Sequence, residues 1–74
     1  MAETSEILAE MVASVLSVAV APGDQVDAGG VLMLLESMKM EIPVLVEVAG
    51  LVTEIRVVPG DLIQEGDVLA VLEH

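Results

Sequence analysis

The amino-acid sequence predicts an all-β domain, a flattened eight-stranded barrel or sandwich built from two halves related by an approximate two-fold axis. Three observations predict this fold. Fourteen of the 74 residues are valine, whose β-branched side chain favours strands. Pro-Gly-Asp, a turn signal, occurs at residues 22–24 and again at 59–61. Ten residues of the first half also recur 37 positions later in one register. Each half is too small to bury its own apolar face, so we expect the two to pack together.

The repeat extends over residues 12–36 without a gap. Chance similarity between valine-rich strands does not explain so many matches in one register. We therefore interpret residues 1–74 as a single domain, with halves at about residues 7–36 and 44–73 and a connecting hairpin at 36–41. Besides the two Pro-Gly-Asp segments, the matched residues are Val15, Val20, Gly29, Val31, Leu32, Leu35 and Glu36, which recur as Val52, Val57, Gly66, Val68, Leu69, Leu72 and Glu73.

The chain is expected to begin with a short, frayed, polar segment, Met1–Ser5. The following segment, Ile7–Leu16, has a spacing of apolar residues that would also suit a helix. Its counterpart in the second half carries Pro43 and Gly50, however, and one architecture cannot be helical in both copies. We therefore assign it to strands.

Each half is then expected to run strand, turn, short strand, turn, strand. In residues 21–24 and 58–61 the proline presets φ near −65° and the following glycine supplies a positive φ, as a type II turn requires. Apolar residues that alternate with a period of two support the strands, as at Val44, Val46 and Val48 and at Ile55 and Val57.

The connecting hairpin holds the single lysine of the chain, Lys39, between Met38 and Met40. The approximate two-fold axis places this hairpin at the end of the domain opposite the chain termini. In a strand-like turn the two methionines would point one way and the lysine the other. A lysine in an exposed turn is usually a solvated charge, and methionine often fills a core, but neither explanation accounts for all three residues at a tip defined by symmetry.

The composition excludes several classes of partner. Thirteen acidic and two basic residues give a formal charge of −11, and there is no aromatic residue or cysteine. With Lys39 and Arg56 as the only cations and no ring for base stacking, neither nucleic acid nor an anionic membrane is an expected partner. No apolar run approaches the roughly 18 residues of a spanning helix, and we expect no secretory signal, because the first 38 residues contain no lysine or arginine. Cysteine-free composition fits a cytoplasmic protein.

Catalytic and metal-binding residues are not predicted. The single histidine, His74, is the last residue, where we expect fraying. Asp24–Gly29 lacks the alternating oxygen ligands of a calcium loop. Arg56 is interpreted as a solvated or ion-paired residue. The acidic residues in the turns, which we interpret as ordinary surface residues, are Asp24, Asp27, Asp61, Glu65 and Asp67.

With Met38-Lys39-Met40 between the halves of a repeat that carries Pro-Gly-Asp turns, the chain resembles the biotinyl domain of biotin-dependent carboxylases. It is most similar to the small free-standing biotin/lipoyl attachment proteins of bacteria. The resemblance covers about residues 7–73 and implies the barrel-sandwich hybrid fold. It also implies a non-catalytic carrier, because the chemistry belongs to the cofactor and to partner enzymes.

Specific roles follow from this resemblance. A biotin protein ligase would join biotin to the amine of Lys39 by an amide bond, and biotin would then carry a carboxyl group between biotin carboxylase and carboxyltransferase components. Met38 and Met40 would be flanking recognition residues, and Glu36 matches the acidic residue usual three places before the lysine. Ser37 replaces the usual alanine, which we expect to be tolerated.

Further comparison with the family narrows the assignment. Glu47 stands where many members have proline, which affects no functional residue, and the ungapped repeat leaves no room for the "thumb" insertion of some acetyl-CoA carboxylase carrier proteins. Two alternatives stay open. A lipoyl carrier would place its lysine at the same tip, although lipoyl domains resemble Asp-Lys-Ala there. An unmodified barrel-sandwich interaction module would leave Lys39 as a surface charge.

Overall fold

The computed structural model describes residues 3–74, which form eight β-strands and, within that range, no helix. Short turns separate the strands, and this arrangement agrees with the run of valines and Pro-Gly signals along the chain. The predicted all-β class is confirmed. The strands are β1 (Thr4–Leu8), β2 (Ala13–Val18), β3 (Gln25–Val26), β4 (Val31–Ser37), β5 (Met40–Leu45), β6 (Gly50–Ile55), β7 (Leu62–Ile63) and β8 (Val68–Glu73).

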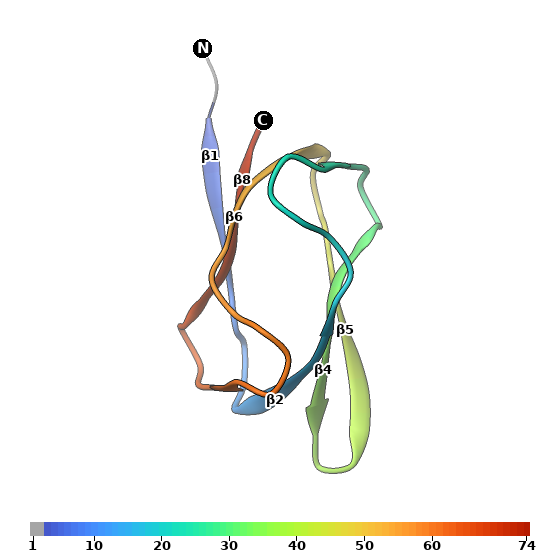
Figure 1. Ribbon diagram of the computed structural model, residues 1–74, viewed down its shortest axis with the longest axis vertical. Coiled ribbons are helices and arrows are strands. Elements are labelled where there is room, and N and C mark those ends of the chain that lie inside the picture. Colours follow the sequence, from blue (N-terminus) through green and yellow to red (C-terminus); the bar gives the residue numbers. More distant parts are fainter. Residues whose placement is uncertain (1–2) are drawn as a thin grey trace.

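The strands form two antiparallel sheets of four, in the orders β1-β8-β6-β3 and β5-β4-β2-β7 (Figure 1). Adding four to each strand number of the first half, and subtracting four in the second, converts one order into the other. Strands from both halves are therefore interleaved in each sheet, so neither half forms a sheet by itself. This is the flattened eight-stranded sandwich that the sequence predicts.

Hydrogen bonds between the sheets and their turns follow the 37-residue offset. The amide of Gly23 donates to the carbonyl oxygen of Val52 at 2.7 Å, and the amide of Gly60 donates to that of Val15 at 2.8 Å. The turn of each half is therefore hydrogen-bonded to a strand of the other half, and these backbone bonds hold the two halves together. The offset also relates the bonds Gly29–Val46 and Gly66–Ala9, and the bonds Ala19–Leu32 and Arg56–Leu69.

The core between the sheets is aliphatic, and the residues described there include no buried polar or charged side chain. Inward-facing residues of β2, β4, β6 and β8 contribute most of it, in keeping with the two-residue period of strands. Its largest fully buried side chains are Leu32, Met33, Leu69, Leu72, Val46 and Val52.

The two Pro-Gly turns have the predicted type II features. Gly23 and Gly60 both have φ of +97°, and the amides of Asp24 and Asp61 donate to carbonyl oxygens three residues earlier, at 3.0 and 3.1 Å. The carboxylates of these aspartates also accept a hydrogen bond from the backbone three residues earlier, at 2.9 and 3.0 Å. Asp67 does the same for the amide of Gln64 at 2.9 Å. These aspartates therefore stabilise turns, a role that the sequence analysis did not assign.

The ends of the chain are more ordered than the sequence suggests. Thr4 and Ser5 belong to β1, and Glu3 and His74 exchange two backbone hydrogen bonds of 2.7 Å. The predicted fraying is wrong for these residues, because β1 pairs with β8 along its whole length and holds both ends in one sheet. The rest of the predicted polar start, residues 1–2, lies outside the described residues.

Candidate functional site

The hairpin between β4 and β5 turns through two residues, Met38 and Lys39. Ser37 pairs with Met40 across the strands, and the two loop residues have φ of +52° and +65°. Positive φ at both central positions is the signature of a type I′ turn, whose twist matches that of the flanking strands. The predicted strand-like alternation of the methionines is therefore wrong, because a two-residue connection between twisted strands leaves no room for extended backbone.

These two loop residues are also the only non-glycine residues with positive φ in the described part of the chain. For an L-residue this conformation costs roughly 1–2 kcal/mol, and glycine or asparagine usually takes it. The sequence thus places Met-Lys where a turn optimised for stability would carry Asn-Gly. Strain of this kind is most often kept where the side chains themselves are needed.

The side chains at the tip are open to solvent. Met38 is 91% exposed and Met40 63%, and Lys39 is exposed as well. Within residues 3–74, Lys39 takes part in neither an ion pair nor a side-chain hydrogen bond. Its amine is therefore free to be approached from outside, flanked on both sides along the chain by apolar side chains.

The stem below the tip is anchored to the core. Leu35 of β4 pairs with Ile42 of β5, and the side chain of Leu35 is 97% buried, since its exposed fraction is 3%. The hydroxyl of Ser37 donates to the carbonyl oxygen of Val12 at 3.2 Å, which ties the last residue of β4 to the neighbouring connection. In Figure 1 the hairpin projects at the end opposite the N and C termini. The predicted location is confirmed, and the amine is carried on a fixed support.

Glu36 lies on the outward face of the same stem. It pairs with Glu41 across β4 and β5 and with Ser14 across β4 and β2, and both glutamates are exposed. Like charges directly opposite each other in a sheet are unfavourable, so both carboxylates need solvent around them. The structure thus places Glu36 on the strand that leads to the tip and places Glu41 opposite it on β5. The sequence analysis did not single out Glu41.

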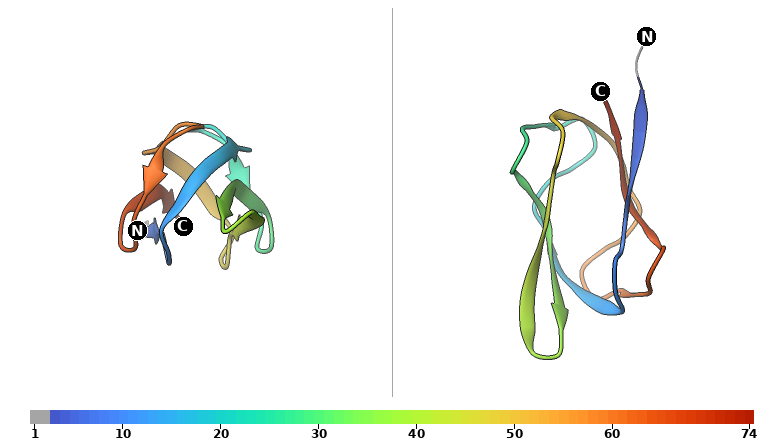
Figure 2. Two further views of the ribbon diagram at one scale, coloured as in Figure 1. Left: turned by 90° about the horizontal axis from the view of Figure 1, so that it is seen from below. Right: turned by 180° about the vertical axis from the view of Figure 1, so that it is seen from behind.

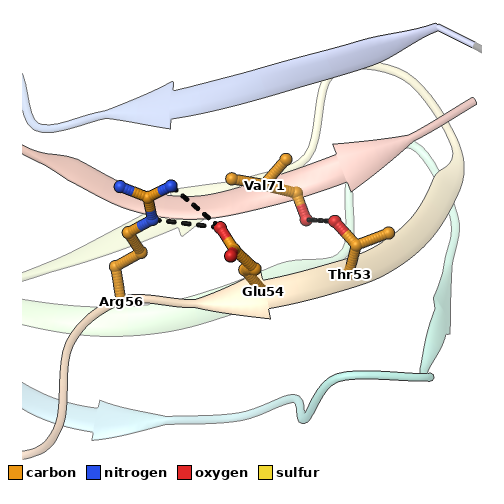
Figure 3. A network of polar contacts seen from close by, with 4 residues as sticks. All are labelled: Thr53, Glu54, Arg56 and Val71. Atoms are coloured by element: carbon orange, nitrogen blue, oxygen red, sulfur yellow. Dashed lines mark hydrogen bonds and ion pairs between the residues drawn. The ribbon is translucent and has the colours of Figure 1, made fainter.

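The second cation of the chain is in a different situation. The guanidinium of Arg56 forms an ion pair with Glu54 at 3.0 Å, and the two side chains are 50% and 54% exposed (Figure 3). In the same view the hydroxyl of Thr53 donates to the carbonyl oxygen of Val71. Of the two interpretations of Arg56, solvated or ion-paired, the structure supports the ion pair, whereas Lys39 has no such partner among residues 3–74.

Other candidate chemistry is not assembled among the described residues. Within residues 3–74, no group of three or more His, Cys, Asp or Glu side chains could hold a metal ion. His74, the single histidine, is hydrogen-bonded through its ring to the hydroxyl of Ser5, and the C terminus lies at the end of the molecule opposite the β4–β5 hairpin (Figure 1). No helix in this part of the chain is long and apolar enough to cross a membrane. The hairpin tip is thus the feature that needs a functional explanation.

Comparison with protein families shows which family the chain belongs to. The biotin/lipoyl family model, described as biotin-requiring enzyme, matches residues 2–72. The chain belongs to the biotin/lipoyl family. The predicted resemblance is therefore confirmed, and the match covers both halves of the fold and the hairpin between them.

Curated relatives agree with this membership. The chain is 68% identical over 40 residues to biotinylated protein TB7.3 of Mycobacterium tuberculosis, and 49% identical over 39 residues to the gamma subunit of glutaconyl-CoA decarboxylase of Acidaminococcus fermentans. These matches cover 54% and 53% of this chain and 56% and 27% of the relatives. The chain thus aligns with little more than half the length of the mycobacterial protein.

Solved structures extend the similarity to nearly the whole fold. One is a single-chain, multi-domain long-chain acyl-CoA carboxylase, with a TM-score of 0.88 and 29% identity, and another is the urea carboxylase of Kluyveromyces lactis, with 0.88 and 30%. The matches cover 93% and 95% of this chain but only 7% and 6% of those chains. Family, relatives and structures together support covalently bound biotin and a carrier function, and biotinylated carrier domains of this family are themselves non-catalytic.

Proposed function

We propose that this chain is a biotin carrier whose attachment point is the Nζ atom of Lys39. One observation carries the proposal: the single lysine of the sequence is exposed at the tip of a strained hairpin and has no ion-pair or side-chain hydrogen-bond partner within residues 3–74. An acylation site needs a nucleophilic amine that an enzyme can reach, and this tip supplies one. The family model and the biotinylated relatives support biotin as the group attached.

A biotin protein ligase would form the amide bond between the carboxyl carbon of biotin and Lys39. We assign Met38 and Met40 as the apolar side chains that the ligase contacts on either side of the amine, since both are largely exposed. Glu36 would be an acidic contact on the stem. The absence of any other lysine means that no second side-chain amine competes for the cofactor.

When bound, biotin would carry a carboxyl group between the biotin carboxylase and carboxyltransferase components of a biotin-dependent carboxylase. The carboxylase neighbours support this class of partner. Residues 1–74 would act as one domain that holds the attachment point away from its own body. The acidic surface favours transient docking, because charged interactions steer encounter more than they hold a complex. We place this exchange in the cytoplasm, in keeping with the cysteine-free sequence.

The proposal is tested by producing the protein together with a biotin protein ligase and biotin, followed by intact-mass analysis. We expect the wild-type chain to gain one biotinyl group and Lys39→Arg to gain none. Peptide mapping then locates the modification. Wild-type protein that stays unmodified, or a Lys39→Arg variant modified to the same extent, would contradict the proposal.

A lipoyl group is the second candidate, since the family includes both cofactors. The paired methionines favour biotin. The same assay with a lipoate ligase distinguishes the two, because we expect no lipoyl group on the wild-type chain. Modification by neither ligase would favour an unmodified interaction module.

A further inference from the structure

The sandwich is open along one side. Turns join the two sheets along one side, and the sheets part along the other, where β1 and β5 are the edge strands (Figure 2). No Cα atom of β1 lies within 8 Å of one in β5, although the two strands hold equivalent positions in their sheets. Between them is a groove of about 950 Å³. We call it the β1–β5 groove.

The walls of this groove are apolar side chains that the fold leaves only half covered. Ile7 of β1 and Ile42 and Val44 of β5 face inward yet are only partly buried. Behind them, the floor consists of fully buried core residues, among them Leu35, Leu69 and Leu72. An occupant that covered the three wall residues would therefore extend the existing core, and the burial of apolar area is favourable.

The rim of the groove is acidic. Four glutamates line it, and neither Lys39 nor Arg56 does. A second copy of a chain with a formal charge of −11 would bring like charges together at this rim, which disfavours self-association. A cationic partner would instead be attracted. The four rim residues are Glu6, Glu10, Glu47 and Glu65.

The two edges differ in their capacity to pair with an added strand. β5 carries Pro43, which has no amide proton to donate, whereas β1, Thr4–Leu8, contains no proline. β1 pairs with β8 on one side only. An extended segment can therefore add to the free edge of β1 and lie toward β5, so that it closes the open side of the sandwich.

We propose that the β1–β5 groove docks an extended segment of a partner protein in which aliphatic residues alternate with lysine or arginine. Alternate side chains of a strand point to opposite faces. The aliphatic set would cover Ile7 and Val44, and the cationic set would lie near Glu10 and Glu47. The groove runs along the body of the domain, so such a partner would hold the domain and leave the hairpin tip exposed.

A synthetic peptide of four Val-Lys repeats, blocked at both ends and carrying a dye, tests this on the full chain. Fluorescence anisotropy measures binding, and amide chemical shifts locate it. We expect binding with the largest shifts in β1 and β5. Peptides with glutamate in place of lysine, or serine in place of valine, should lose it, because the first is repelled by the rim and the second cannot cover the walls.

Matched charge variants separate the groove from general attraction. Glu10→Gln with Glu47→Gln should weaken binding about fivefold, as expected for two exposed charge pairs. The control, Asp27→Asn with Glu54→Gln, removes the same charge from residues that do not line the groove and should change binding less than about twofold. Equal losses in both variants, shifts centred on β3 and β7, or undiminished binding of the serine peptide would overturn the proposal. Concentration-dependent shifts in β1 and β5 without peptide would replace it with self-association.

Discussion

The two ends of this molecule have equivalent strand pairings but differ in chemistry. At one end Ser37 pairs with Met40, and at the other, 37 positions away, His74 pairs with Glu3 through two backbone hydrogen bonds. At the first end two residues, Met38 and Lys39, join the paired strands, and at the second the strands are the two ends of the chain. The repeat thus builds equivalent supports, and the two-residue connection gives one of them an exposed lysine.

The strongest test of this comparison moves the amine while the composition stays the same. The double variant Lys39→Arg/Arg56→Lys keeps one lysine, one arginine and the charge of −11. We expect it to accept no biotin from a biotin protein ligase, because residue 56 follows β6 and lies beside Glu54 instead of in a tight turn. Intact-mass analysis measures this. The single variant Arg56→Lys is the control and should be biotinylated once. A second biotinyl group on it would show that any exposed lysine accepts biotin, whether or not it lies in the hairpin turn.

A smaller effect is expected when a turn of the repeat is broken. Gly60 has φ of +97°, and a Cβ atom there would meet nothing within 4 Å, so the cost of a side chain comes from the backbone alone. Gly60→Val should lower the free energy of unfolding by about 1–3 kcal/mol, since a β-branched residue resists positive φ. Denaturant unfolding measures it. Gly23→Val probes the equivalent turn and should behave alike, so a large difference between the two would show that the halves are not energetically equivalent.

A difference between the halves predicts a third effect. Asp67 accepts the amide of Gln64, whereas the equivalent residue of the first half is Gly30, where a Cβ atom would lie 3.0 Å from the carbonyl oxygen of Asp27. Asp67→Ala should cost about 0.5–1.5 kcal/mol, the usual net value of a hydrogen bond. The unfolding midpoint measures this. Asp27→Ala is the matched control and should change the midpoint less, because the Asp27 carboxylate makes no hydrogen bond among residues 3–74.

The smallest effect on folding is expected at the hairpin tip. Met38→Gly removes a side chain that is 91% exposed and relieves a residue with φ of +52°, so the free energy of unfolding should stay level or rise by up to about 1 kcal/mol. Biotin attachment should nevertheless slow, because the apolar contact beside Lys39 is lost. Time-resolved mass analysis with a ligase compares the rates. A clear loss of stability with unchanged attachment would mean that Met38 serves the fold instead of the site.

Much of the site could be predicted because its signal is local or repeated. The single lysine lies between two methionines at the midpoint of the repeat. This position predicted that it would lie at the end of the domain opposite the termini. The backbone of the tip could not be predicted in this way: the type I′ geometry at Met38 and Lys39 depends on the twist of β4 and β5, and Met-Lys is not a sequence typical of that turn. The hydrogen bonds of Asp24, Asp61 and Asp67 escaped notice for a related reason, since aspartate is common in turns whether or not it accepts one.

The sequence by itself determined the fold class, the two-fold arrangement of strands and the place of Lys39 in the connecting hairpin. Periodicity, turn chemistry and repetition are local features that can be recognised along the chain. Only the tertiary structure decided what depends on distant segments. It ordered the chain ends by pairing β1 with β8, and it left β1 and β5 apart so that a groove with an acidic rim opens between them. Such features arise because the edge strands of the two sheets come from different halves, and no local pattern records how far apart packing leaves them.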